Sequence, residues 1–144
     1  INAIIPTNLV NMRFSRKTDY GIILIEALRP TFRARAYVPL SEIARERRMP
    51  YEFLQKIAGI LRRVGYLEAR RGSEGGYRLL RDPRKITLKE LIDVFEEPEM
   101  MRCMKSPHPE KYCPFVGACP TRAGWLGIEK KVNKIFENVT IASL

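Results

Sequence analysis

Apolar residues recur at helical spacing in three segments of the chain. The pattern predicts amphipathic helices over residues 17–28, about 51–64 and about 121–139. Pro30 follows the first segment and Gly65 follows the second, and both residue types are common where helices end. The chain is therefore expected to be mainly α-helical.

The segment between the first two helices predicts a helix-turn-helix motif. Residues 30–40 hold two prolines and predict a loop or a short extended piece. Ser41 is a good N-cap for a short helix to about residue 48, and Pro50 suits the first turn of the next helix. Two short helices joined by a tight turn are typical of this motif. The free face of the second helix offers Tyr51, Gln55, Lys56, Arg62 and Arg63.

Two strand-like segments follow directly, and they predict a β-hairpin. Residues 66–70 and 76–80 flank a short tip that contains glycine, which accepts the positive φ of a tight turn. A hairpin beside a helix-turn-helix predicts a winged helix. Arg70 and Arg71 lie on one side of the tip and Arg78 on the other, where a wing meets DNA.

The second half of the chain combines a capped helix with a proline-rich loop. Thr87 and Glu90 fit a capping box that opens a helix to about residue 97. Residues 98–121 hold five prolines, all three cysteines and the only histidine, and show no periodicity. A segment of this length without periodicity more often has a function than serves only as a connection.

The last predicted helix carries a heptad-like apolar stripe. One interpretation is a core helix packed on its own domain. Because the helix is long and the rest of the chain is small, we favour self-association, and a homodimer would match two-fold-related DNA half-sites. The stripe consists of Trp125, Ile128, Val132, Ile135 and Val139.

The distribution of charge indicates the partner. The net charge of +10 arises in residues 12–85, which hold 18 basic and 8 acidic residues, whereas residues 86–144 hold eight of each. The excess lies on the predicted winged helix, which favours double-stranded DNA as the partner. The expected contacts are Tyr51, Gln55, Lys56 and Arg63 on the helix and Arg70, Arg71 and Arg78 on the wing.

These observations divide the chain into three parts. We expect residues 1–11 to be an extension or remnant, and residues 12–85 to form a winged helix-turn-helix DNA-binding domain. Residues 86–144 are expected to supply a linker helix, a cysteine loop over 98–121 and a dimerisation helix over 121–139.

Two other classes of protein are disfavoured. The longest uncharged apolar run, residues 1–12, is too short to span a bilayer and lacks a basic leader, so we expect a cytoplasmic protein without a membrane partner. No combination of nucleophile, base and oxyanion donors is visible, and the single His108 lies in a loop, which argues against an enzyme.

Cys103, Cys113 and Cys119 are the candidate chemical site. Their clustering in a C-x9-C-x5-C pattern argues against scattered core thiols, and three cysteines argue against a disulfide scaffold. Loop thiolates can converge on a soft metal or on an iron–sulfur cluster. His108 would complete a Cys3His zinc site as one alternative, and unligated thiols are another.

Several motifs together resemble the Rrf2 family of bacterial transcription regulators. The resemblance covers residues 12–144, and the wing with its double glycine is its most specific part. The motifs are MRFS at 12–15, SEIA at 41–44, FLQKI at 53–57, LRRVG at 61–65, GSEGGYRL at 72–79 and ITL at 86–88.

The resemblance implies a homodimeric winged-helix repressor or activator that binds operator DNA. Cluster-binding members of the family hold an iron–sulfur cluster with three cysteines before the last helix, which corresponds to Cys103, Cys113 and Cys119. The first interval between cysteines is longer here than is usual in the family. The cluster type, 2Fe-2S or 4Fe-4S, stays open, as does a structural role of the loop with zinc or without a metal.

The fourth ligand separates two branches of the family. In one branch a histidine follows the third cysteine, but this chain has Arg122 there, and a cation cannot ligate. In the other branch an aspartate near the start of the first helix reaches across the dimer, and Asp19 matches it. The resemblance therefore ranks Asp19 of the partner subunit first and His108 second. Such a regulator would sense redox state, nitric oxide or iron–sulfur status.

Overall fold

The computed structural model describes residues 14–96 and 102–144. The extension expected at residues 1–11 lies outside the described residues, as do the first residues of the predicted cysteine loop. Seven α-helices, two strands and two 3-10 turns are found in the described part. In chain order they are α1 (Arg16–Ala27), α2 (Arg29–Ala34), α3 (Leu40–Glu46), α4 (Tyr51–Arg63), β1 (Leu67–Arg70), β2 (Gly76–Leu79), α5 (Leu88–Phe95), α6 (Arg102–Lys105), η1 (Pro109–Lys111), α7 (Arg122–Glu137) and η2 (Ile141–Ser143).

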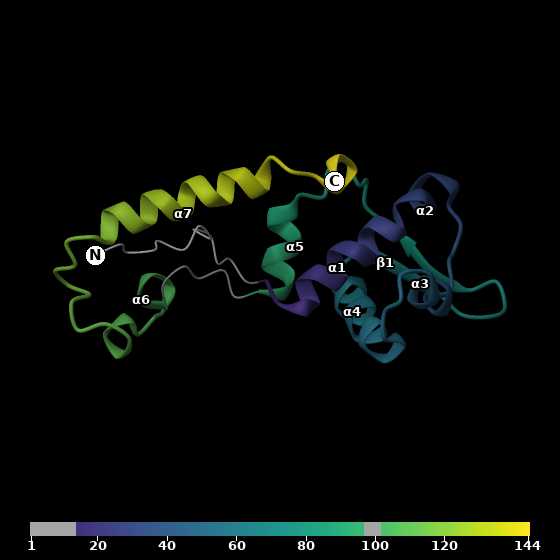
Figure 1. Ribbon diagram of the computed structural model, residues 1–144, viewed down its shortest axis with the longest axis horizontal. Helices are drawn as coiled ribbons and strands as arrows, with labels where there is room; N and C mark the ends of the chain where they lie inside the picture. Colours follow the sequence, from purple (N-terminus) through teal and green to yellow (C-terminus); the bar gives the residue numbers. More distant parts are fainter. Residues whose placement is uncertain (1–13, 97–101) are drawn as a thin grey trace, which may run out of the picture.

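This arrangement confirms a mainly helical fold with a hairpin wing and a long C-terminal helix (Figure 1). Helices α3 and α4 form the helix-turn-helix, with Arg48 in the turn at a φ of 53°. The predicted stop at Gly65 is also present, with a φ of 81° that favours glycine.

Two expectations about residues 30–41 were wrong. Residues 30–34 of the predicted loop belong to helix α2, which the Thr31 hydroxyl fixes by donating to the Leu28 carbonyl at 2.6 Å and accepting from the Leu79 amide at 3.0 Å. Ser41 is not an N-cap, because Pro39 occupies that position and the buried Leu40 begins α3. Helix α2 does not follow from the local sequence, since the Leu79 partner of Thr31 lies far along the chain.

The hairpin pairs β1 and β2 in antiparallel register, from Leu67 opposite Leu79 to Arg70 opposite Gly76. Val38 adds a bridge to Tyr77 on the outer side of β2. A side chain at Gly76 would meet the Val38 carbonyl at 2.3 Å, so glycine is required where these backbones meet.

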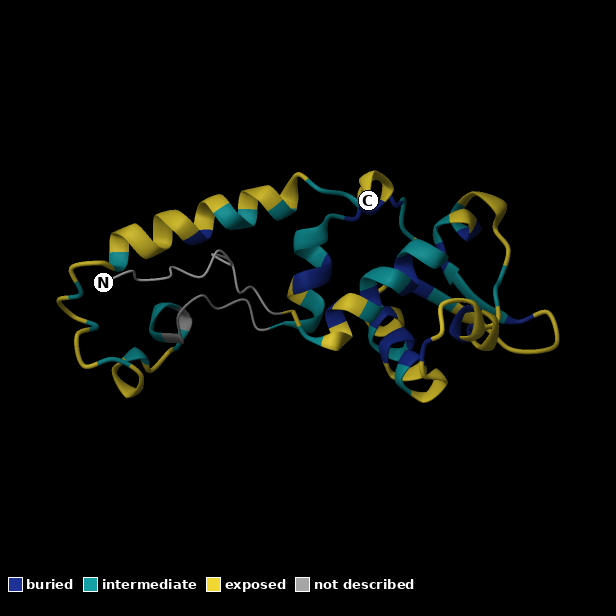
Figure 2. Ribbon diagram, viewed as in Figure 1, coloured by how far each residue is buried: buried dark blue, intermediate teal, exposed yellow. Residues whose placement is uncertain are grey.

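A single hydrophobic cluster joins the winged helix to the second half of the chain. It includes Leu24, Leu61 and Leu79 from the first half and Ile86 and Ile141 from the second. The Ile141 amide donates to the Ile86 carbonyl at 3.0 Å, so the chain returns to this core after α7. Figure 2 shows the buried residues gathered in the winged helix, whereas most of α7 is exposed.

The cysteine region is more ordered than its sequence indicates. Residues 98–121 show no periodicity, yet the described part of this stretch contains α6 and the 3-10 turn η1. The Thr87–Glu90 capping box is confirmed at the start of α5. Beyond α5, the cysteine region and α7 extend away from the winged helix (Figure 1).

Candidate DNA interface and cysteine site

Helix α4 presents a polar face beside a buried one. Leu54, Ile57 and Leu61 are fully or almost fully buried against the core. The four residues expected to contact DNA, Tyr51, Gln55, Lys56 and Arg63, are all exposed. The 3.6-residue repeat separates these two faces, so the helix can lie in a DNA groove without losing its core contacts.

The wing arginines differ in how tightly they are held. The Arg78 guanidinium pairs with Glu68 across the hairpin, and this pair holds the pKa of the Glu68 carboxyl below its usual value, with a further contribution from the Tyr37 hydroxyl. Arg70 and Arg78 also lie over the ring of Tyr37, with their guanidinium carbons 5.7 and 5.4 Å from its centroid. Arg71 is exposed. Sequence reasoning found the arginines but missed Tyr37 and Glu68, which organise them.

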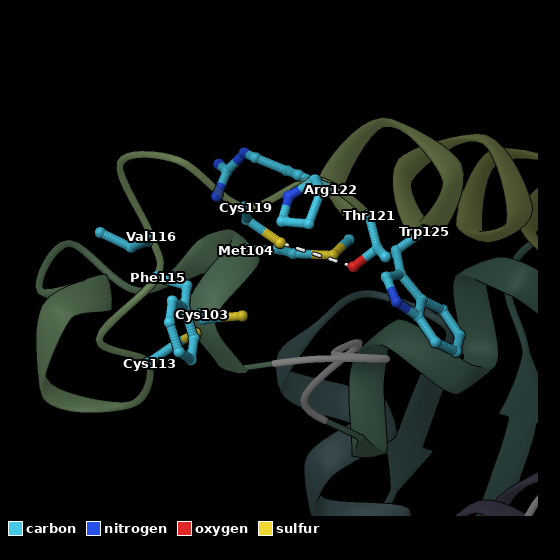
Figure 3. A pocket seen from close by; sticks show the side chains of 10 residues that line it. Cys103, Met104, Cys113, Phe115, Val116, Cys119, Thr121, Arg122 and Trp125 are labelled. Atoms are coloured by element: carbon cyan, nitrogen blue, oxygen red, sulfur yellow. Dashed lines mark hydrogen bonds between the residues drawn. The ribbon is translucent and has the colours of Figure 1, made fainter.

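Cys103, Cys113 and Cys119 line one cavity of about 350 Å³. Side chains from α6, the following loop and the first turns of α7 surround it (Figure 3). Phe115 and Trp125 are among its apolar walls. All three cysteines are half-buried free thiols. The structure therefore brings the three candidate ligands to the wall of one cavity.

Cys119 has the most polar surroundings of the three thiols. The Thr121 hydroxyl lies 3.5 Å from its sulfur and, with the nearby backbone amides and the charge of Arg122, lowers the pKa of the Cys119 thiol. A lowered pKa favours the thiolate, which is the form that binds metals.

The two candidates for a fourth ligand lie away from this cavity. His108 is exposed and its Nδ1 is 3.4 Å from a carboxylate oxygen of Glu110. Asp19 is exposed in the first turn of α1. Within the described ranges no group of three or more His, Cys, Asp or Glu side chains is arranged to hold a metal ion.

Helix α7 exposes much of the predicted apolar stripe. Trp125, Ile128 and Ile135 are 38%, 44% and 62% exposed. The described contacts of α7 with other elements are mainly to α5.

No helix in the described part of the chain is long and apolar enough to cross a membrane.

A helix-turn-helix, a paired hairpin and a basic exposed face together define a winged-helix DNA-binding protein. The family model described as "Rrf2: Iron-dependent Transcriptional regulator" matches residues 14–144. The chain belongs to the Rrf2 family and is a DNA-binding transcription regulator, not an enzyme.

Individual relatives agree with this family. The chain is 32% identical to the protein aau3 of Rhizobium meliloti over 88% of this chain and 78% of that one. Its fold is similar to the structure of T. potens IscR, with a TM-score of 0.69 and 24% identity over 92% of this chain and 85% of that one. The structure of CymR of B. subtilis gives the same TM-score and identity, over 92% and 95% of the two chains.

Proposed function

We propose that this chain is a homodimeric regulator that senses redox state, nitric oxide or iron–sulfur status through a cluster held by Cys103, Cys113 and Cys119. The observation that carries the proposal is that these three thiols line one apolar cavity. Scattered cysteines would not share a cavity, and an apolar wall limits access of water to a metal site.

The donor set fits an iron–sulfur cluster better than a single zinc ion. Zinc needs four donors at about 2.0–2.3 Å around one point, whereas the cavity offers three thiols and His108 does not line it. A cluster spreads its ligands over several irons, and thiolates are its usual ligands. When bound, such a cluster supplies one-electron chemistry and reactivity toward nitric oxide and oxygen.

The residues of the chain have separate tasks in this proposal. The three cysteines bind the cluster, Thr121 favours the Cys119 thiolate, and Phe115 and Trp125 supply part of the apolar wall. Asp19 of the partner subunit is the first choice for the fourth ligand, as the family resemblance implies, and its exposure at the start of α1 is compatible with that role. His108 is the second choice, since it already lies beside Glu110.

Dimerisation would connect sensing to DNA binding. The exposed stripe on α7 supplies an apolar surface for a second copy, and α7 runs between the cysteine cavity and the end of the chain that packs on the winged helix. A ligand shared by the two chains would join the loop of one to α1 of the other. Changing that link shifts the two α4 helices, and the affinity for operator DNA changes with their spacing.

We also propose the functional division at residue 85, with DNA binding in residues 12–85 and with sensing and dimerisation in residues 86–144. It is a division of tasks and not of separately folded domains, because Ile86, Leu91 and Ile141 belong to the same hydrophobic cluster as the winged helix.

Metal analysis of anaerobically purified protein tests the cluster. We expect iron with acid-labile sulfide and visible absorbance, and loss of all three in Cys113→Ser. One zinc per chain without sulfide, or neither metal, would instead support a structural loop and contradict the sensor.

Two further measurements test the ligand and the coupling. Asp19→Ala should alter the cluster spectrum and its stability, whereas Glu42→Ala, which removes an exposed first-turn acid from α3, should not. Equal affinity of cluster-containing and cluster-free protein for one operator duplex would contradict the coupling.

A further inference from the structure

Helix α2, the end of β2 and the segment after it enclose a basic groove, and Arg78, an expected wing contact, lies at its edge. Two neighbouring cavities of about 340 and 460 Å³ share Phe32 and Arg33 in their walls, and we call the combined lining the α2 groove. Five arginines line it: Arg29, Arg33, Arg35, Arg78 and Arg84.

Two of these arginines are already neutralised. Arg84 pairs with Asp82 at 2.7 Å, and Arg78 pairs with Glu68. Among the described residues, Asp82 is the only acidic one that lines the groove, and both of its carboxylate oxygens accept from Arg84. Arg29, Arg33 and Arg35 have no carboxylate partner among the described residues, so the groove holds three positive charges without internal compensation.

The platform that presents these charges is fixed. Thr31 is 3% exposed and ties α2 to β2 through the Leu28 carbonyl and the Leu79 amide. Arg29 and Arg33 are four residues apart on this helix, a spacing that puts like charges on one face and destabilises the helix. An anion between them would remove that repulsion.

The groove and the recognition helix lie on different elements. Helix α2 contacts α1 and β2, whereas α4 contacts α1, α3 and β1. In Figure 1, α2 and α4 lie on opposite sides of α1. A ligand in the groove therefore need not occupy the face that α4 presents to DNA.

We propose that the α2 groove is a binding site for a diphosphate-bearing ligand, with Arg29 and Arg33 as direct contacts. Guanidinium groups bind phosphate oxygens in pairs of parallel hydrogen bonds, and three uncompensated cations match the charge of a diphosphate. Phe32 and the prolines Pro30 and Pro83 form apolar walls beside the cations, which suits an organic group attached to the phosphates, as in a nucleoside diphosphate.

Calorimetric titration of the full chain with inorganic pyrophosphate and with ADP tests the site. We expect both to bind the unaltered protein, and Arg29→Gln/Arg33→Gln to weaken binding at least tenfold. Lys130→Gln/Lys131→Gln removes the same charge from the exposed surface of α7 and should leave the affinity within twofold. Arg33→Gln alone, at an exposed position, provides a milder variant if the double variant folds poorly.

A duplex of random sequence distinguishes a free ligand from the phosphates of DNA. If DNA supplies the phosphates, the slope of log affinity for the duplex against log salt concentration should decrease in magnitude by about 0.9 for each arginine removed. If the ligand is free, this slope should not change while pyrophosphate binding is lost. The proposal is overturned if pyrophosphate and ADP do not bind, if the double variant binds them as tightly as the unaltered protein, or if the control variant loses as much affinity. The cysteine site takes no part, so the result is independent of cluster binding.

Discussion

The ring of Phe95 lies directly over Gly21 where α5 crosses α1. A β-carbon on Gly21 would be 2.3 Å from Cε2 of Phe95, a distance at which the ring of Phe95 or the helix that carries it must shift. We expect Gly21→Ala to lower the free energy of unfolding by about 1–3 kcal/mol through overpacking. Gly59→Ala is the matched control, because nothing lies within 4 Å of its β-carbon in α4, and it should raise stability by about 0.5–1 kcal/mol. Chemical denaturation measures both, and equal effects would contradict the contact.

Tyr37 should contribute to DNA binding through the wing. Its ring lies under Arg70 and Arg78, and such contacts stabilise by about 0.5–1 kcal/mol at exposed sites. Tyr37→Leu should therefore weaken binding to a duplex about two- to fivefold, as measured by fluorescence anisotropy. Tyr37→Phe keeps the ring and should retain most of the affinity. A loss as large in Tyr37→Phe would assign the effect to the hydroxyl at Glu68 instead.

Glu96 links the end of α5 to the start of α1. Its carboxylate accepts from the Ser15 amide at 2.6 Å and from the hydroxyl of the fully buried Thr18. Glu96→Ala leaves these donors without their acceptor and should cost about 1–3 kcal/mol in the free energy of unfolding. Asp93→Ala breaks only the surface pair with Lys89 in the same helix and should cost no more than about 0.5 kcal/mol.

The same carboxylate makes stability depend on pH. Burial by itself raises the pKa of Glu96, but the hydrogen bonds from Thr18 and Ser15 outweigh it and hold that pKa below its usual value. A lowered carboxyl pKa stabilises the fold above the unfolded-state value, and this contribution is lost as pH falls through the folded-state value.

Asp82 should titrate at unusually low pH. Four hydrogen bonds from the side chain and backbone of Arg84 lower the pKa of the Asp82 carboxyl from 3.8 to about 2. Its contribution to stability should be complete above about pH 4 and lost between that value and about pH 2. Carbon-detected NMR titration measures this pKa directly, and Arg84→Ala should return it toward 3.8. An unchanged pKa in that variant would contradict the assignment to Arg84.

The apolar stripe on α7 should hold the homodimer together. Ile135→Glu places a charge on its most exposed apolar residue and should shift sedimentation from dimer to monomer. Lys131→Glu changes the charge of the same helix at an exposed polar position and should leave the dimer intact. A monomeric unaltered protein would contradict the proposed interface.

Local pattern predicted most of the fold, because the elements of the winged helix are specified by near neighbours. Thr87 and Glu90 cap α5 as their spacing indicates, and Gly65 ends α4. Helix α2 was missed because the buried hydroxyl of Thr31 finds its partner at Leu79, 48 residues away. A pattern read over about ten to twenty consecutive residues cannot include both Thr31 and Leu79.

The candidate site was predictable in its residue types and not in its surroundings. Three clustered cysteines indicated a metal or cluster site, and all three do line one cavity. The aromatic walls at Phe115 and Trp125, and the hydrogen bond from Thr121, depend on how the loop folds back on α7. The organising role of Tyr37 in the wing depends likewise on cross-strand geometry.

The return of Ile141 to Ile86 has a consequence for synthesis. These two core residues are separated by 55 positions, which adds a contact of long sequence separation to the small DNA-binding core. At about 5–20 residues per second, a ribosome needs several seconds to add that stretch. During this time the nascent winged helix lacks its last core side chain. A new molecule therefore completes its DNA-reading fold only after the cysteine loop and α7 have been translated.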